Sequence, residues 1–258
     1  MDVAELIDEM GRTPSATARA SGLSRMTVHR LRDGVSSPTL ATLRELALAA
    51  GYDIDVSLVP ASDPAAAVAA RVMADPATPP LDHLEEWGMT DPDDVDAIST
   101  WVTRLERQGG HEPKRLLELA GRSSAPQHRK GARFFAPKPG LTQEQIVGIA
   151  NSALGGLTGA LSGVAAARVY LGHAPDPGPV VSWTNDLAAV AQRLASTLRE
   201  ADEYQPAGVL LAPTMPAYFV DMMMPPAWDH QIVSPIQAAI DLYGLGYEEL
   251  ANEITEGW

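Results

Sequence analysis

The sequence contains no cysteine. A disulfide framework, a thiolate metal site and a cysteine nucleophile are therefore excluded. It also has no apolar run as long as a membrane-spanning helix requires. The first residues, Met-Asp-Val-Ala-Glu, lack the basic start of a signal peptide. We therefore expect a cytoplasmic protein with no membrane partner.

Motifs of common catalytic sites are also missing. The sequence has no Gly-x-Ser-x-Gly nucleophile elbow, no phosphate-binding loop ending in Lys-Ser or Lys-Thr, and no histidine pair at helical ligand spacing. We therefore expect no metal site, no cofactor and no enzymatic activity. Structural roles are expected for the scattered histidines, which are His83, His111, His128, His173 and His230.

Charge is distributed unevenly along the chain. The formal net charge is −14, which is unusual for a protein that gains DNA affinity by neutralising phosphates. Residues 11–34 nevertheless carry five arginines and one aspartate, whereas residues 61–110 carry ten acids and three arginines. The acidic excess favours solubility and predicts weak non-specific DNA binding. A second basic cluster consists of His128-Arg129-Lys130 with Arg133.

The stretch 13–34 predicts two short helices joined by a tight turn. Thr13 is suited to cap the first helix, and Pro14 fits the first helical position, where its missing N–H costs nothing. Gly22 supplies the turn, and Ser24 is suited to cap the second helix. This pattern indicates a helix-turn-helix, although an ordinary helical hairpin would share it.

The second of these helices has one apolar stripe and one polar face. Val28 and Leu31 are three residues apart and are expected to point into the core. The remaining side chains face outward, as on a helix that enters the major groove of DNA. The predicted DNA-binding residues are Ser15, Ser24, Arg25, Met26, Thr27, His29 and Arg30.

Several positions share their spacing with one repressor family. They are Ala18, Gly22, Val28, Leu31 and Gly34, followed by Ser36-Ser37-Pro38. The stretch resembles the Cro and cI-like (XRE-type) helix-turn-helix family, which implies a double-stranded DNA operator as partner and a homodimer on two half-sites. Pro14 stands where that family usually has a glutamine that contacts the DNA backbone, and Arg32 stands where a glutamate is common.

Residues 53–59 alternate between polar and apolar side chains and predict a single edge strand. The four helices expected before it contain no strand to pair with. The strand could pair across a two-fold axis, which would favour a homodimer, or with the following domain. Asp53 and Asp55 have a spacing that some enzymes use for Mg²⁺. Because no Gly-Ser turn precedes them, we interpret them as the solvated face of the strand.

The predicted fold class is a mainly α N-terminal helix-turn-helix domain plus an α/β (α+β) C-terminal domain. Residues 1–60 are the predicted DNA-binding domain, residues 61–125 a helical connecting region, and residues 126–258 a regulatory or partner-binding domain. Additional helices are expected at 3–10, 39–50, 65–73, 91–108 and 112–120.

In the C-terminal region, helical and strand patterns alternate. Residues 121–130 are polar and unpatterned and predict a loop. Helices are expected at 142–154 (opened by a capping box), at 157–171 (Ala-rich and buried), and at 186–199, 235–242 and 247–255. Strands are expected at 134–135, 179–183, 208–212 and 218–224. The last of these includes Met222-Met223-Met224, for which a soft binding surface is the alternative.

The segments ALSGVAAARVYLG, DLAAVAQRLA, GVLLAP and VSPIQAAIDLYGLGYEELANEI follow one another between Ala160 and Ile254. In this order the segments resemble the C-terminal domain of AbiEi-like regulators. These regulators are the antitoxin and autorepressor members of type IV toxin–antitoxin pairs. This resemblance implies a cognate toxin as a further partner. The family commonly has Arg-Gly where this chain has Leu245-Gly246, and its N-terminal domain is usually a winged helix.

The leading hypothesis is a sequence-specific DNA-binding transcriptional repressor, the antitoxin and autorepressor of a toxin–antitoxin-like operon. The alternative is a one-component transcription factor whose C-terminal domain senses a small ligand. An enzyme fused to a DNA-binding module is a weaker third hypothesis.

The late acidic residues either form a face for a basic partner or keep the last helix soluble. They are Asp241, Glu248, Glu249, Glu253 and Glu256.

Overall fold

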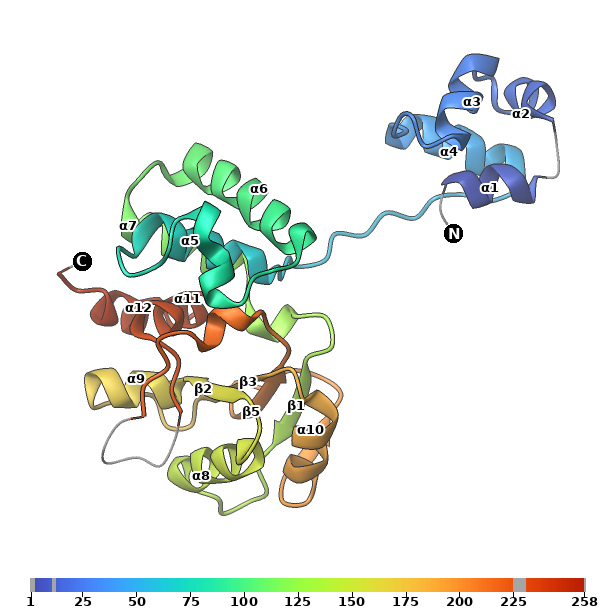
Figure 1. Cartoon of the computed structure of the whole chain (residues 1–258). Coiled ribbons are helices and arrows are strands. Elements are labelled where there is room, and N and C mark those ends of the chain that lie inside the picture. Colours follow the sequence, from blue (N-terminus) through green and yellow to red (C-terminus); the bar gives the residue numbers. More distant parts are fainter. Residues whose placement is uncertain (1–2, 11–12, 225–230, 258) are drawn as a thin grey trace. The chain divides into compact units, whose positions relative to one another are not determined.

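The computed structural model describes residues 3–10, 13–224 and 231–257. The chain forms two compact units, Met1–Val59 and Pro60–Trp258 (Figure 1). The first unit is built from helices, and the second combines helices with a five-stranded mixed sheet. The prediction of an α+β protein is thereby confirmed at the level of fold class. The helices predicted as a connecting region at 61–125 belong to the second unit.

Four helices make up the first unit. They are α1 (Val3–Glu9), α2 (Pro14–Ser21), α3 (Arg25–Arg32) and α4 (Leu40–Ala50). Thr13 Oγ1 accepts a hydrogen bond from the Ala16 N–H, and Ser24 Oγ accepts one from the Thr27 N–H. Both predicted caps are therefore confirmed. The helices enclose a small core of Leu6, Ile7, Ala18, Val28, Leu31, Leu46 and Ala47.

The strand predicted at 53–59 is not formed. No described residue pairs with this segment in a ladder, and every side chain in it except Ile54 is exposed. Alternation alone cannot make a strand, because the backbone N–H and C=O groups need a neighbouring strand. Asp53 instead accepts hydrogen bonds from the Ile54 N–H at 2.8 Å and from Arg44 Nε at 3.2 Å. These two contacts lower the pKa of Asp53.

The sheet of the second unit has the strand order β2-β3-β5-β1-β4. Its central strands β3 and β5 are parallel, and the other pairs are antiparallel. Helices α8 (Gln143–Leu154) and α10 (Leu187–Ala195) cover one face, and α9 (Val164–Leu171) and α11 (Pro235–Leu245) cover the other (Figure 1). The strands are β1 (Arg133–Ala136), β2 (Gly159–Gly163), β3 (Pro179–Thr184), β4 (Arg199–Ala201) and β5 (Gly208–Ala212).

An outer layer of helices packs against α11. Its central member, α5 (Pro64–Ala74), is buried on every side from Ala65 to Arg71. Burial of a whole helix explains why this region is part of the second unit and not a linker. The other members are α6 (Pro92–Gly109), α7 (Pro113–Ser123) and α12 (Glu248–Ile254). Short 3-10 helices occur at η1 (Leu81–Trp87), η2 (Pro126–His128) and η3 (Pro216–Phe219).

The Ala-rich stretch at 157–171 is not one helix. Residues Gly159–Gly163 form the buried strand β2, and only the residues from Val164 onward are helical. Gly163 causes the change of direction: its φ is +68°, and a Cβ there would lie 2.5 Å from the Pro179 carbonyl oxygen. The alanine content predicts burial correctly, but it does not distinguish a buried strand from a buried helix.

Three other predicted boundaries are wrong. The helix at 186–199 ends at Ala195, and β4 begins at Arg199. The strand at 218–224 is replaced by η3 and by a single bridge between Met223 and Ile232. The loop at 121–130 contains the end of α7 and all of η2. The capping box of Thr142 and Gln145 and the remaining predicted helices and strands are present.

Candidate nucleic-acid interface

Helix α3 separates its apolar residues from its polar ones. Val28 and Leu31 are almost fully buried in the core of the first unit. On the opposite side, Arg25, His29 and Arg30 are exposed. Met26 also lies on the exposed side, with 70% of its surface accessible. The four-helix unit therefore presents α3 as an open surface with two arginines and one histidine.

The arginines of α3 differ in their surroundings. Arg32 Nε lies 3.2 Å from Asp8 Oδ1, so this side chain connects α3 to α1. His29 Nδ1 lies 3.9 Å from Asp33 Oδ2. Within the described ranges, Arg25 and Arg30 have no acidic partner. Their guanidinium groups are thus available to a ligand that offers acceptors in pairs, such as phosphate or guanine.

Six of the seven predicted DNA-binding residues lie on α3 or at its N-cap. Arg25, Met26, Thr27, His29 and Arg30 belong to α3, and Ser24 is its N-cap. Ser24 Oγ and Thr27 Oγ1 lie 2.8 Å apart, so both hydroxyls already take part in the cap. Ser15 is half-buried in the first turn of α2. Arg12, which contributes to the basic stretch 11–34, lies outside the described residues.

The second basic cluster, at 128–133, does not form a basic surface. Arg129 is buried and donates hydrogen bonds to the Ser62 hydroxyl at 3.1 Å and to the Tyr218 hydroxyl at 3.2 Å. Arg133 forms two 2.7 Å hydrogen bonds with the carboxylate of Glu200. These arginines therefore hold parts of the second unit together, and only His128 and Lys130 are left exposed without such a role.

Asp241 is buried at the centre of a hydrogen-bond cluster. Its carboxylate accepts bonds from Ser162 Oγ at 2.6 Å, Trp183 Nε1 at 2.7 Å and Gln237 Nε2 at 2.9 Å. Burial raises the pKa of Asp241 to about 6, although the three hydrogen bonds act in the opposite direction. Gln237 and Asp241 are four residues apart on α11, so the last of these bonds joins two turns of one helix. A partner surface cannot include Asp241, because α11 turns this side chain toward the sheet.

The other late acidic residues are exposed. Glu253 Oε2 lies 2.9 Å from His173 Nε2, and Glu248 Oε1 lies 3.7 Å from Arg122. Glu249 and Glu256 are exposed on α12 and just beyond it. Four of the five predicted carboxylates thus remain accessible to a partner.

A second buried cation lies on α5. The Arg71 side chain is fully buried and donates one hydrogen bond to the Ala217 carbonyl oxygen at 2.8 Å and another to Asp221 Oδ2 at 2.7 Å. Its guanidinium carbon lies 4.5 Å from the centre of the Trp87 ring. Burial lowers the pKa of Arg71, while the charge of Asp221 opposes that change. Asp221 also lines a pocket of about 600 Å³.

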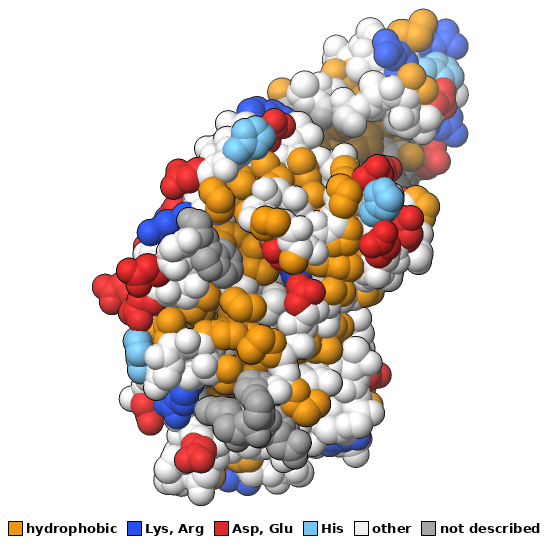
Figure 2. Space-filling view, turned by 60° about the vertical axis from the view of Figure 1, so that its left-hand side comes forward, with side chains coloured by type: hydrophobic (Ala, Val, Ile, Leu, Met, Phe, Trp, Pro, Cys, Tyr) orange, Lys and Arg blue, Asp and Glu red, His pale blue; other side chains and the backbone are white. Residues whose placement is uncertain are grey.

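Hydrophobic side chains gather on the face of the second unit drawn in Figure 2, with acidic side chains among them. Met223 and Met224 are 42% and 64% exposed. These two methionines therefore do not seal the core, as the predicted strand would require, whereas Met222 is partly buried against it. Asp229 and His230 lie outside the described residues.

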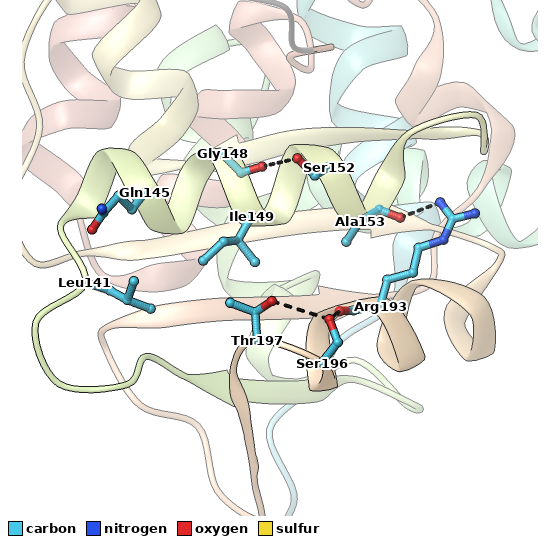
Figure 3. Close-up of a pocket in the computed structure, with 9 residues that line it drawn as sticks. All are labelled: Leu141, Gln145, Gly148, Ile149, Ser152, Ala153, Arg193, Ser196 and Thr197. Atoms are coloured by element: carbon cyan, nitrogen blue, oxygen red, sulfur yellow. Dashed lines mark hydrogen bonds between the residues drawn. The ribbon is translucent and has the colours of Figure 1, made fainter.

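An open groove of about 620 Å³ runs between α8 and α10 (Figure 3). Its apolar floor includes Leu141, Ile149 and Ala153. At one end, Arg193 Nη1 donates hydrogen bonds to the carbonyl oxygens of Ala153 at 2.9 Å and Gly155 at 2.7 Å. Arg193 therefore binds the C-terminal end of α8 through one of its two Nη groups.

The described parts of the chain contain no helix that is both long and apolar enough to span a membrane. They also bring together no group of three or more His, Asp or Glu side chains that could hold a metal ion. Comparison with known proteins finds no relative: no family model, no curated protein and no solved structure matches the chain.

Proposed function

We propose that the chain is a sequence-specific DNA-binding transcriptional repressor whose helix α3 enters the major groove of its operator. The observation that carries this proposal is the exposed face of α3. It combines Arg25 and Arg30, which lack acidic partners among the described residues, with the polar side chain of His29. Arginine is the side chain that most often makes a paired hydrogen bond to guanine.

The geometry around α3 supports this assignment. The helix begins directly after a turn at Gly22, whose φ is +69°, and Ser24 caps it. A short capped helix after such a turn is the arrangement of a helix-turn-helix, in which residues near the start of the second helix contact base edges. Arg25 and Arg30 fall in the first and second turns of α3.

The charge distribution fits a protein that binds DNA only at selected sites. The net charge of −14 weakens attraction to DNA of arbitrary sequence, because counterion release supplies most non-specific affinity. Base contacts then account for a larger share of the binding free energy. We further propose a homodimer on two half-sites, since one helix of eight residues contacts only a few base pairs.

The second unit is proposed to bind a partner. The resemblance of 160–254 to AbiEi-like regulators supports an antitoxin and autorepressor with a cognate toxin. The exposed carboxylates of Glu248, Glu249, Glu253 and Glu256 are suited to a basic partner surface. Affinity capture with the full chain from its native host tests this proposal. It predicts a stoichiometric protein partner that is lost when these four glutamates are replaced by glutamine.

Ligand sensing is the second candidate function of this unit. The pocket of about 600 Å³ beside the Arg71–Asp221 pair favours it, because apolar pockets with a few polar groups are typical small-molecule sites. In this case operator affinity should change when the ligand is added, and no protein partner is required.

A further inference from the structure

The pocket beside Asp221 is formed where three helix ends meet. It lies between the C-terminal end of α5, the first residue of α7 and the first turn of α11. Most of its wall is hydrocarbon. The apolar lining residues are Ala74, Pro76, Ala77, Pro113, Pro235 and Ile236. A volume of about 600 Å³ is enough for a small organic molecule.

The polar groups of the pocket favour one type of ligand. They belong to two carboxylates, Asp75 and Asp221, and to the hydroxyl of Ser234. No lysine, arginine or histidine is among the described residues that line the pocket. Among the described lining residues, an anionic ligand would therefore meet two negative charges and no cation, whereas a cationic ligand would meet two carboxylates and a hydroxyl oxygen that can accept.

Of the two carboxylates, Asp221 is the one with a vacant oxygen. Asp75 Oδ1 accepts from the Ala77 N–H at 2.9 Å, and Asp75 Oδ2 accepts from the Thr78 hydroxyl at 3.0 Å. Asp221 Oδ2 accepts from Arg71, and its Oδ1 has no partner in the described chain. The Asp221 side chain is 38% exposed, so a ligand can reach this oxygen.

The surrounding charge also favours a cation. Among the described residues, Arg71 is the one guanidinium in contact with Asp221, and it also interacts with the charge of Asp75. One buried positive charge thus faces two carboxylates, and the pocket retains net negative charge. None of the described lining residues is aromatic, so these residues provide no cage of the kind that usually binds a quaternary ammonium. An ammonium with N–H groups has no such need.

We propose that this pocket binds an apolar primary or secondary amine. Its ammonium donates a hydrogen bond to Asp221 Oδ1, and its hydrocarbon body packs against the proline and alanine side chains of the wall. This inference rests on ligand sensing as the function of the second unit, and it is independent of operator recognition by α3.

Three probes with one hydrocarbon body and different head groups test the proposal. The full chain is titrated at pH 7 with cyclohexylmethylamine, cyclohexylmethanol and cyclohexanecarboxylate by calorimetry and by thermal unfolding. We expect the amine to bind, and at roughly a hundredfold excess over its Kd to raise the unfolding midpoint by about 5–10 °C. The alcohol and the carboxylate should bind at least about tenfold more weakly.

Two variants locate the binding. Ala77→Trp fills the exposed side of the pocket and should abolish amine binding. Asp221→Asn keeps an acceptor for Arg71 but removes the charge, and should weaken amine binding at least about tenfold. Asp202→Asn, at an exposed position outside the pocket lining, is the matched control and should bind the amine as the unaltered chain does.

Each outcome decides the proposal. No response to any probe, or unchanged binding in Ala77→Trp, would overturn the site. Equal responses to amine and alcohol would overturn the ammonium contact with Asp221. If Asp221→Asn does not fold, the head-group series and Ala77→Trp still decide. Operator binding is measured separately without amine, so its failure would refute the DNA-binding proposal and leave the pocket result intact.

Discussion

Arg71 Nη2 donates a hydrogen bond to Asp221 Oδ2 at 2.7 Å and so joins two residues that are 150 positions apart in the chain. The arginine is fully buried, and Asp221 is the described residue that satisfies its charge. Asp221 has a φ of +63°, a backbone conformation that residues other than glycine rarely adopt. The ion pair therefore holds the chain after η3 in an otherwise unfavourable conformation.

We predict that Asp221→Gly destabilises the second unit although glycine accepts the positive φ without strain. The substitution leaves a buried guanidinium without its counterion. We expect a loss of about 3 kcal/mol in the free energy of unfolding, at the lower end for buried pairs because Asp221 is partly exposed. Urea unfolding followed by tryptophan fluorescence reports on this unit alone, because all five tryptophans follow residue 60. A loss below about 1 kcal/mol, equal to that of Asp202→Gly, would contradict this prediction.

Asp241 should make the stability of the second unit depend on pH. In the folded protein the Asp241 carboxyl stays protonated up to about pH 6, because its pKa is raised. In the unfolded chain an aspartate loses its proton near pH 3.9. Between these values the folded protein binds the proton more tightly, so the stabilising contribution is full below about pH 4. It is lost as the pH rises through 6.

Asp241→Asn should remove this dependence. The Gln237 amide can turn its Oε1, which has no partner among the described residues, toward the new amide N–H. The variant should therefore be more stable than the unaltered chain above pH 6, on the order of 3 kcal/mol, and the difference should shrink toward pH 4. Urea unfolding at several pH values measures it. Glu249→Gln, at an exposed position, should give a profile parallel to that of the unaltered chain. A pH-independent difference for Asp241→Asn would argue against the raised pKa.

The features that the sequence predicts correctly have local causes. Thr13 and Ser24 cap helices through backbone groups three positions away, and Thr142 forms its capping box with Gln145. The apolar run 208–212 is predicted as a strand because its side chains need burial on both faces. Each of these features is determined by a short stretch of neighbouring residues.

The missed features depend on distant partners. Arg129 belongs to a polar run, and its burial requires Ser62 and Tyr218, which are far away in the sequence. The turn at Gly163 is forced by the close approach of Pro179. Asp221 has no sequence signal at all, because the importance of its carboxylate follows from a cation on α5. A pattern search cannot find such a site before the chain is folded.

Self-association through residues 53–59 remains a prediction. Antiparallel pairing centred on Val56 would place Asp53 opposite Val59 and Asp55 opposite Ser57, so no two acids face each other. The pairing would cover Leu58, whose surface is 97% exposed, and would satisfy the free backbone groups. We expect the full chain to form a dimer in light scattering.

The double variant Val56→Asp, Leu58→Asp should weaken this dimer at least about tenfold, because it places four like charges across the ladder. Ser57→Thr alters the other face of the segment without adding charge and should leave the dimer unchanged. A monomer both free and on operator DNA would refute the homodimer.

The first unit is predicted to make two kinds of contact with DNA, one from α3 and one from α2. Arg30 is predicted to contact a base, and Ser15, at the start of α2, a phosphate. Arg30→Ala should lower affinity for the operator by about 1–3 kcal/mol, or roughly 5- to 150-fold, and should also reduce the preference over a scrambled duplex. Ser15→Ala should weaken binding to both duplexes by the same factor.

The most direct test is a selection of duplexes from a random pool by the full chain, followed by titration of the selected and a scrambled sequence. We predict one enriched motif, and a preference for it that Arg30→Ala reduces. Arg107→Ala, which removes an exposed charge from the second unit, should leave the preference unchanged. The absence of an enriched motif, or an equal loss of affinity for both duplexes in Arg30→Ala, would contradict base recognition by α3.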